Sequence, residues 1–229
     1  MLKEYLLERK LRKEICDIGE MIYKRGFVSA NDGNISAKIC ENEFLITPTN
    51  VSKGAMKPWM IVKTDADGNI IKGRSKISSE HKMHLRVYKE NNKVNAVVHA
   101  HPQCATSFAI AGEKLDKALL TEAVVLIGIV PVADFAMPGT EEVPDSIAPF
   151  CKKYNAVMMK NHGVLTWGKD LKQAHFRMEA VENYAVITMH LKNYFANVGH
   201  MTNEQIEGLL DIRKSLGITT GGRPETEEK

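Results

Sequence analysis

The N-terminal segment carries apolar residues at helical spacing. Between Leu2 and Lys24, apolar side chains recur every three or four residues, at Leu6, Leu7, Leu11, Ile15, Ile18, Met21 and Ile22. This spacing places them on one face of an α-helix. Gly26 follows at the position where a glycine commonly ends a helix. The pattern therefore predicts a helix over residues 2–24.

Short apolar and β-branched runs alternate with further helical patterns along the rest of the chain. The runs predict strands at 34–39, 43–48, 60–63, 69–71, 94–99, 124–132, 156–159 and 164–166, with Asp67-Gly68 as a hairpin turn. Helices are predicted at 79–90, 102–111, 141–154, 171–195 and 203–215. Ser78 or Ser79 and Asp170 are the expected N-caps. We expect an α/β fold with a central sheet flanked by helices.

Domain organisation follows from the same pattern. No internal repeat and no linker interrupts residues 1–218, so we expect one domain there. Residues 219–229 are polar and rich in glycine, proline and glutamate, and we expect a mobile C-terminal tail.

Composition excludes several classes of protein. The chain has 229 residues, of which 44% are hydrophobic and 26% charged, as in ordinary globular proteins. The net charge is only +3 and the lysines and arginines are spread along the chain, which disfavours nucleic-acid binding. Four scattered cysteines and a charged N-terminus without a leader pattern indicate a cytoplasmic protein with reduced thiols. The apolar stretch 123–136 is too short and interrupted for a membrane span.

Three histidines are the strongest candidates for chemistry. His99 and His101 lie two residues apart on a predicted strand, so their side chains share one face. His162 lies in a distant predicted turn and offers a third nitrogen. Three imidazoles with one open position are typical of a catalytic metal site, for Zn²⁺ or another divalent first-row metal. His81 and His84, three residues apart on one predicted helix, are a competing pair that could form a site with Glu80, but a place on the helix surface or in the core is the favoured interpretation of both.

Polar motifs elsewhere have both structural and functional interpretations. Ser78 and Ser79 precede a predicted helix, where hydroxyl and backbone N–H groups bind phosphate or simply cap the helix. Glu80, in the first turn, is favoured there by the helix dipole even without a catalytic role. The loops 30–36 and 46–54 offer turn residues and amides. No phosphate-binding loop or dinucleotide-binding motif occurs in the sequence.

Taken together and in order, five motifs resemble the class II aldolase/adducin-head family. They are Gly33-Asn34-Ile35-Ser36, Thr47-Pro48-Thr49, Ser78-Ser79-Glu80, His99-Ala100-His101-Pro102 and Asn161-His162-Gly163. The resemblance extends from about residue 11 to about residue 217 and is strongest to the branch of L-fuculose-1-phosphate aldolases. It implies a single-domain α/β/α sandwich with a central, mainly antiparallel sheet.

The resemblance also implies roles for individual residues. The zinc ligands are His99, His101 and His162, and the acid/base is Glu80. The phosphate contacts are Asn34, Thr49, Ser78 and Ser79, and Asn50 is a further substrate contact at a position where such aldolases often have glycine. The implied reaction cleaves a ketose 1-phosphate to dihydroxyacetone phosphate and an aldehyde through a zinc-stabilised enediolate. The implied assembly is a homotetramer with sites near subunit interfaces.

Other branches of the family remain open. Pentulose-phosphate 4-epimerases share the zinc site but usually have aspartate where Glu80 stands. Decarboxylases of oxo-acid phosphates and a methylthioribulose-phosphate dehydratase use related sites, whereas adducin-like heads are non-catalytic binding modules that typically lose metal ligands. The retained histidines and Glu80 favour an enzyme. The tyrosines that such aldolases use at the aldehyde end are unmatched in 119–122 and at Leu216, and Glu122 is a candidate substitute or simply a surface carboxylate.

Overall fold

The computed structural model describes residues 2–226, and these contain one eight-stranded sheet. Its strand order is β4-β3-β2-β1-β5-β8-β7-β6. The strands are β1 (Asn34–Cys40), β2 (Glu43–Ile46), β3 (Val62–Thr64), β4 (Ile70–Lys72), β5 (Ala96–Ala100), β6 (Val132–Ala133), β7 (Ala156–Met159) and β8 (Gly163–Gly168). Within the described chain, β6 and β7 form the one parallel pair. The expected central, mainly antiparallel sheet is confirmed.

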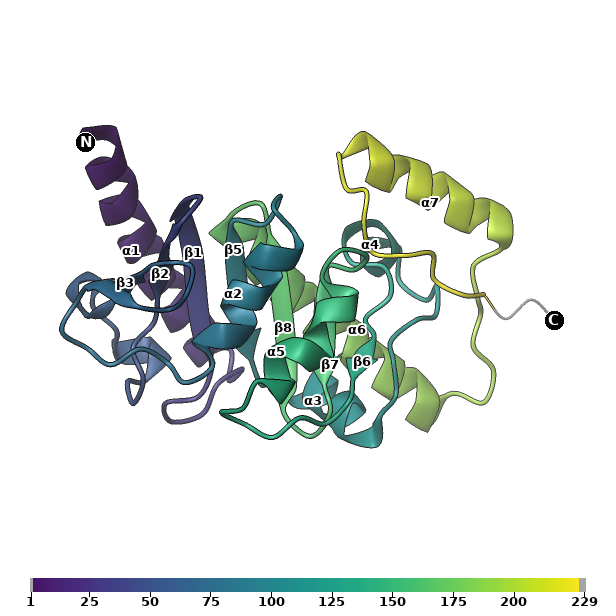
Figure 1. Cartoon of the computed structure of the whole chain (residues 1–229). Helices are drawn as coiled ribbons and strands as arrows, with labels where there is room; N and C mark the ends of the chain where they lie inside the picture. Colours follow the sequence, from purple (N-terminus) through teal and green to yellow (C-terminus); the bar gives the residue numbers. More distant parts are fainter. Residues whose placement is uncertain (1, 227–229) are drawn as a thin grey trace.

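Helices cover both faces of this sheet (Figure 1). They are α1 (Leu2–Lys24), α2 (His81–Glu90), α3 (Gln103–Ala111), α4 (Thr121–Leu126), α5 (Glu142–Ile147), α6 (Leu171–Tyr194) and α7 (Asn203–Ser215), with 3-10 turns at Lys53–Ala55, Pro58–Met60 and Ala148–Phe150. Helices α1, α3 and α6 pack on one face, and α2 and α5 pack on the other. This arrangement is the predicted α/β/α sandwich.

Side chains along β5 point alternately to the two faces of the sheet, and so to the two helical layers. Ala96, Val98 and Ala100 belong to the core under α1, α3 and α6, whereas Val97 belongs to the core under α2 and α5. His99 therefore lies on the α2 side, because side chains two residues apart on a strand share a face. The chain thus buries an imidazole in an otherwise apolar strand.

The predicted strand over 124–132 is wrong. Residues 121–126 form α4, Gly128 turns the chain with a φ of +81°, and only Val132 and Ala133 pair as a strand. Periodicity does not distinguish a short buried helix from a buried strand, because both are apolar throughout. Here Val124 packs against Ile206 of α7, which accounts for the apolar run.

Helix boundaries also differ in places. Helix α2 begins at His81 with Glu80 at its N-cap position, so neither Ser78 nor Ser79 occupies that position. Ser78 is held in an extended segment, where its N–H donates to Thr47 O, and this delays the start of the helix. The helix predicted over 141–154 ends at Ile147 and continues as a 3-10 turn. Asp170 caps α6 as predicted, since its side chain accepts from Gln173 N.

The segment after α7 runs back over the domain. Gly221 N donates to Lys153 O, and Glu225 forms backbone hydrogen bonds with Asp116 and Ala118. The described part of the expected tail, 219–226, is therefore held by backbone hydrogen bonds, and residues 227–229 lie outside the described residues. Among the helices of residues 2–226, none combines the length and apolarity needed to cross a bilayer. All four cysteines lie in this range and are free.

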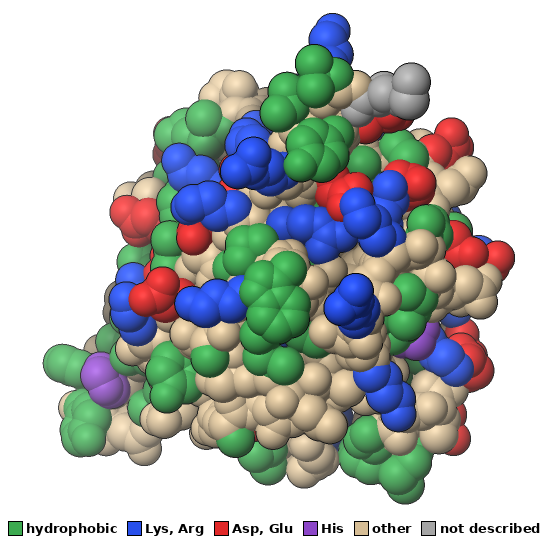
Figure 2. Space-filling view, turned by 90° about the vertical axis from the view of Figure 1, so that its left-hand side faces the viewer, with side chains coloured by type: hydrophobic (Ala, Val, Ile, Leu, Met, Phe, Trp, Pro, Cys, Tyr) green, Lys and Arg blue, Asp and Glu red, His purple; other side chains and the backbone are tan. Residues whose placement is uncertain are grey.

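Cations that are distant in sequence meet on the side of the molecule that carries α1 and β3. Figure 2 shows lysine and arginine side chains gathered there among hydrophobic groups. A hollow of about 560 Å³ on the β4 edge is lined by Tyr5, Glu8, Arg9, Arg12, Pro58, Trp59, Ile61, Lys72, Gly73 and Arg74. Arg12 donates to Glu8 across 2.9 Å, which neutralises part of this charge. The hollow contains none of the predicted site residues.

Candidate active site

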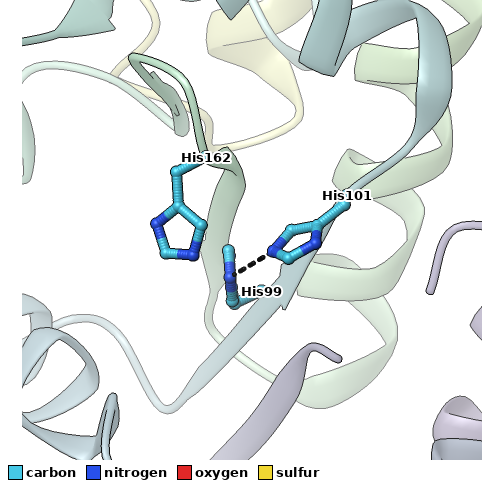
Figure 3. A group of neighbouring side chains, drawn as sticks. All are labelled: His99, His101 and His162. Atoms are coloured by element: carbon cyan, nitrogen blue, oxygen red, sulfur yellow. Dashed lines mark hydrogen bonds between the residues drawn. The ribbon is translucent and has the colours of Figure 1, made fainter. Parts of the chain in front are cut away.

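His99, His101 and His162 converge on one point (Figure 3). One ligand nitrogen from each lies within 4.8 Å of the others. The ring centroids are separated by 4.8 Å for His99–His101, 4.8 Å for His99–His162 and 5.2 Å for His101–His162. The His81–His84 pair forms no comparable cluster with Glu80 among the described residues. The histidines predicted to bind metal are thus brought together.

Local structure explains this convergence. His99 lies inside β5, opposite Asn34 of β1 and Leu165 of β8, so the sheet register fixes its position. His101 follows the strand, and its N–H donates to Phe27 O. His162 lies in the tight turn between β7 and β8, directly after Asn161, which has a φ of +57°. Asparagine tolerates this left-handed conformation better than most residues.

Outer contacts orient the rings. His99 Nδ1 lies 2.9 Å from Val164 O, and because a carbonyl only accepts, Nδ1 carries the proton. In the neutral ring the Nε2 lone pair of His99 then faces His101 Nε2, 3.0 Å away. Asp32 Oδ2 lies 3.8 Å from His101 Nδ1 on the outer side of that ring. Carboxylate and carbonyl partners of this kind are typical of metal-binding histidines.

Burial favours the protonation state that a metal needs. It lowers the pKa of His99 well below its ordinary value and also lowers the pKa of His101, in both cases mainly through desolvation of the charged ring. Metal ligation requires neutral imidazole. The oriented lone pair of His99 and the convergence of three ring nitrogens therefore fit a divalent cation.

Glu80 lies against this triad. Its Oε1 is 2.9 Å from His162 Nε2, and its Oε2 is 3.6 Å from His99 Nε2. Oε2 also accepts a hydrogen bond of 2.6 Å from Asn34 Nδ2. Burial acts to raise the pKa of Glu80, but its interactions with His99 and His162 and the hydrogen bond from Asn34 lower it below the ordinary value. The side chain is therefore an anion beside the metal site.

The predicted phosphate contacts are only partly gathered around Glu80. Asn34 and Ser78 are buried, and Asn34 Nδ2 lies 3.2 Å from Ser78 Oγ. Thr49 is joined to the neighbouring segment by its N–H, which donates to Lys76 O. Ser79 and Asn50 are exposed, and Asn50 has a φ of +58°. The three loops thus lie together, with two of the five side chains buried and two facing solvent.

Sequence reasoning missed two buried residues near these loops. Lys53 is 1% exposed and donates from Nζ to Asn31 O and Val51 O, so it joins two of the loops. Burial lowers its pKa to about 8. His84 is fully buried and contacts Asn34. A lysine in a glycine-containing loop gave no signal that it is buried. Packing was one interpretation of His84, but the sequence did not indicate its contact with Asn34.

Two glycines of the site motifs stand where there is no room for a side chain. A Cβ on Gly33 would lie 2.8 Å from His99 O, and its φ is +73°. A Cβ on Gly163 would collide with the His101 ring and lie 2.7 Å from Ala100 O. Both glycines therefore allow close packing against the metal-site strand.

We expect Gly163→Ala to weaken metal binding, because the added methyl group displaces the His101 ring. Displacing a ligand should cost at least as much as losing an outer-shell partner, about 10–100-fold in affinity. Metal titration of the purified variant measures this. Gly208→Ala, on α7 with open space around the added methyl group, is the matched control. Unchanged affinity in Gly163→Ala would contradict the packing argument.

Comparison with known proteins identifies the family. The profile for the class II aldolase and adducin N-terminal domain matches residues 13–189 of the 229. The chain belongs to this family. An L-fuculose phosphate aldolase of Methanococcus maripaludis is 33% identical over 180 residues, covering 79% of this chain and 97% of the relative.

Other members of the class II aldolase family carry different names. A 3-oxo-tetronate 4-phosphate decarboxylase of Cupriavidus necator is 31% identical over 190 residues, covering 81% of this chain and 87% of the relative. A solved structure of an L-fuculose 1-phosphate aldolase superposes with a TM-score of 0.83 at 29% identity, covering 90% of this chain and 96% of that one. The fold is thus that of this family, and the three histidines are consistent with the divalent metal site that is typical of it.

Proposed function

We propose that this protein is a zinc-dependent aldolase that cleaves a ketose 1-phosphate to dihydroxyacetone phosphate and an aldehyde. The observation that carries the proposal is the position of Glu80. Its carboxylate lies 2.9 Å from His162 Nε2 and 2.6 Å from Asn34 Nδ2. One acid/base group therefore reaches both the metal site and a substrate loop, which is the geometry that proton transfer at a bound sugar phosphate requires.

The loops around Glu80 bind and orient the phosphate end. Ser78 and Asn34 present a hydroxyl and an amide from the protein interior, and exposed Ser79 and Asn50 face the incoming substrate. The buried ammonium of Lys53 adds positive charge behind the same loops. Holding the phosphate fixes the distance from Glu80 to the reacting carbon, and such positioning lowers the barrier substantially.

Glu80 supplies the proton. When the C3–C4 bond of the ketose breaks, the C4 hydroxyl releases its proton to water, the aldehyde forms and the electron pair stays on C3. Glu80, an anion at rest, takes up a proton from water and passes it to C3. Oε2 of Glu80 accepts from Asn34, and Oε1 lies 2.9 Å from His162 Nε2, a nitrogen that would turn to the metal when one is bound. Oε1 would then be the oxygen that delivers the proton to C3. A zinc ion held by His99, His101 and His162 would supply Lewis acidity toward the oxygens of the substrate.

The decarboxylase relative supports a second candidate function. Loss of carbon dioxide from a 3-oxo-tetronate 4-phosphate leaves an electron pair on C2, beside the C3 carbonyl. The resulting three-carbon enediolate is the same as the one that retro-aldol cleavage produces. Glu80 would protonate it in the same way, and dihydroxyacetone phosphate would again be the product. The two candidate reactions therefore differ in the group that leaves.

A substrate panel separates these candidates. Holoenzyme is incubated with ketose 1-phosphates, L-fuculose 1-phosphate among them, and with a 3-oxo-tetronate 4-phosphate. The co-products are then measured as aldehyde and as carbon dioxide. We expect aldehyde and dihydroxyacetone phosphate from a ketose 1-phosphate. Carbon dioxide release without cleavage of any ketose 1-phosphate would replace the aldolase by the decarboxylase, and epimer formation without cleavage would favour a pentulose-phosphate 4-epimerase.

The family resemblance supports two further parts of the proposal. We infer a homotetramer with active sites near subunit interfaces and a cytoplasmic location. Glu122, the candidate substitute at the aldehyde end, is exposed in the first turn of α4, where a neighbouring subunit could contact it.

A further inference from the structure

A series of hydrogen bonds runs from the core under α2 to Glu80. Tyr88 Oη lies 2.7 Å from Ser36 Oγ, which lies 2.7 Å from His84 Nδ1. His84 Nε2 lies 2.5 Å from Asn34 Oδ1, and Asn34 Nδ2 lies 2.6 Å from Glu80 Oε2. Four of these five side chains are at most 5% exposed, so the series is almost wholly inside the protein.

Glu80 determines the direction of every bond in this series. A carboxylate only accepts, so the amide of Asn34 must turn its NH₂ group to Glu80 and its oxygen to His84. That oxygen also only accepts, so His84 must donate from Nε2. The other nitrogen, Nδ1, then accepts from the hydroxyl of Ser36. Ser36 in turn accepts from Tyr88, and all four bonds point toward the carboxylate.

The state of the His84 ring agrees with this direction. Burial lowers the pKa of His84 to about 3, so the ring is neutral, with one donor and one acceptor nitrogen. In the neutral ring, Nε2 donates to Asn34 and Nδ1 accepts from Ser36. In a charged ring both nitrogens would donate, so Ser36 could no longer donate to Nδ1. Strand β1 places both partners of His84 on the same side of the sheet, because Asn34 and Ser36 lie two residues apart and so share the face that carries α2.

We propose that His84 is a positioning residue that holds the Asn34 amide with its NH₂ group toward Glu80, and so keeps the carboxylate in place for proton transfer. This inference rests on the proposed role of Glu80. An amide has two nearly equivalent orientations when nothing selects between them. In the reversed orientation an oxygen would face the carboxylate, and the two would repel each other. The donor on His84 excludes that orientation.

Two substitutions at His84 separate this role from simple packing. His84→Gln keeps an amide NH₂ near the position of Nε2, whereas His84→Asn is shorter and reaches only the Ser36 side. We expect His84→Asn to lower kcat by about 10–100-fold, as loss of an outer-shell partner does, with unchanged metal content. His84→Gln should retain most of the kcat. Equal kcat in the two variants would overturn the proposal.

Controls keep folding effects apart from positioning. Tyr88→Phe removes the far end of the series and leaves the His84–Asn34 bond in place, so it should lower Tm without lowering kcat. In an Asn34→Ala background, His84→Asn should cause no further loss of kcat, since both changes remove the same interaction. If the reductions in kcat caused by Asn34→Ala and by His84→Asn were fully additive, the two residues would not act through one interaction, and the proposal would be contradicted.

A readout without catalysis tests the orientation directly. ¹⁵N NMR of the metal-loaded protein should find the His84 proton on Nε2 and show that it exchanges slowly with solvent. In Asn34→Ala the hydrogen bond from Nε2 is absent, so this slow exchange should be lost. A proton on Nδ1 would overturn the inference while leaving the proposed function intact. If the wild-type protein cleaves no substrate of the panel, the proposed function fails, and the NMR result alone decides whether His84 holds Asn34.

Discussion

Glu80→Gln is expected to lower kcat by about 10²–10⁴-fold, the usual contribution of a general acid or base. Glutamine matches the shape of glutamate but cannot carry a transferable proton. KM and metal content should change little, because the three histidines and the phosphate loops remain. Steady-state kinetics with the best substrate of the panel, together with metal analysis of the same sample, measures all three quantities.

A matched control guards against a general effect of charge loss. Glu41→Gln removes an exposed carboxylate in the turn between β1 and β2, at the opposite end of β1 from Asn34, and should leave kcat unchanged. The catalytic assignment would be refuted by wild-type kcat in Glu80→Gln. A loss of both metal and activity in that variant would instead make Glu80 a structural support of the metal site.

Loss of one metal ligand is the second large effect. His162→Ala should abolish measurable turnover and lower metal affinity by more than about 100-fold, beyond the cost of losing an outer-shell partner. His162 is partly exposed and lies in a turn, so its truncation leaves the core intact. Competition with a chromophoric chelator measures the affinity, and His190→Ala, at an exposed position on α6, serves as the control.

Metal binding should also stabilise the fold. A ligand present at 100 times its Kd adds about 2.7 kcal/mol to the free energy of unfolding. For a chain of this length that corresponds to an increase in Tm of about 5–10 °C. Chelated wild-type protein and His162→Ala should therefore share a lower Tm, which added zinc raises only in the wild type. Identical Tm values with and without zinc would argue against a metal site at these histidines.

The histidine site could be predicted because its geometry is local. Two residues of separation on a strand place His99 and His101 on one face, and this needs no knowledge of the rest of the fold. His162 was different: it lies in a distant turn directly before β8, so the residue pattern offered it only as a candidate third nitrogen, and the family resemblance then joined it to the pair. Sheet register supplies that connection physically, because β5 pairs with β8.

Secondary structure and burial were harder to predict where they depend on contacts with distant parts of the chain. The run containing Val124 is apolar because it lies between the main core and α7, and its sequence does not say whether it does so as helix or strand. His84 and Lys53 have ordinary surface-like sequence surroundings, yet both are buried by segments far away in the chain. Their polar atoms are satisfied by hydrogen bonds that only the folded structure brings together.

Solvent exchange at dihydroxyacetone phosphate tests the central claim most directly. Metal-loaded protein is incubated with dihydroxyacetone phosphate in D₂O without any aldehyde, and deuterium at the carbon bearing the free hydroxyl is followed by NMR. Glu80 and the metal site acting together should introduce a single deuterium at that carbon, and Glu80→Gln and metal-free protein should introduce none. No exchange in the metal-loaded wild type, or full exchange in Glu80→Gln, would contradict the account.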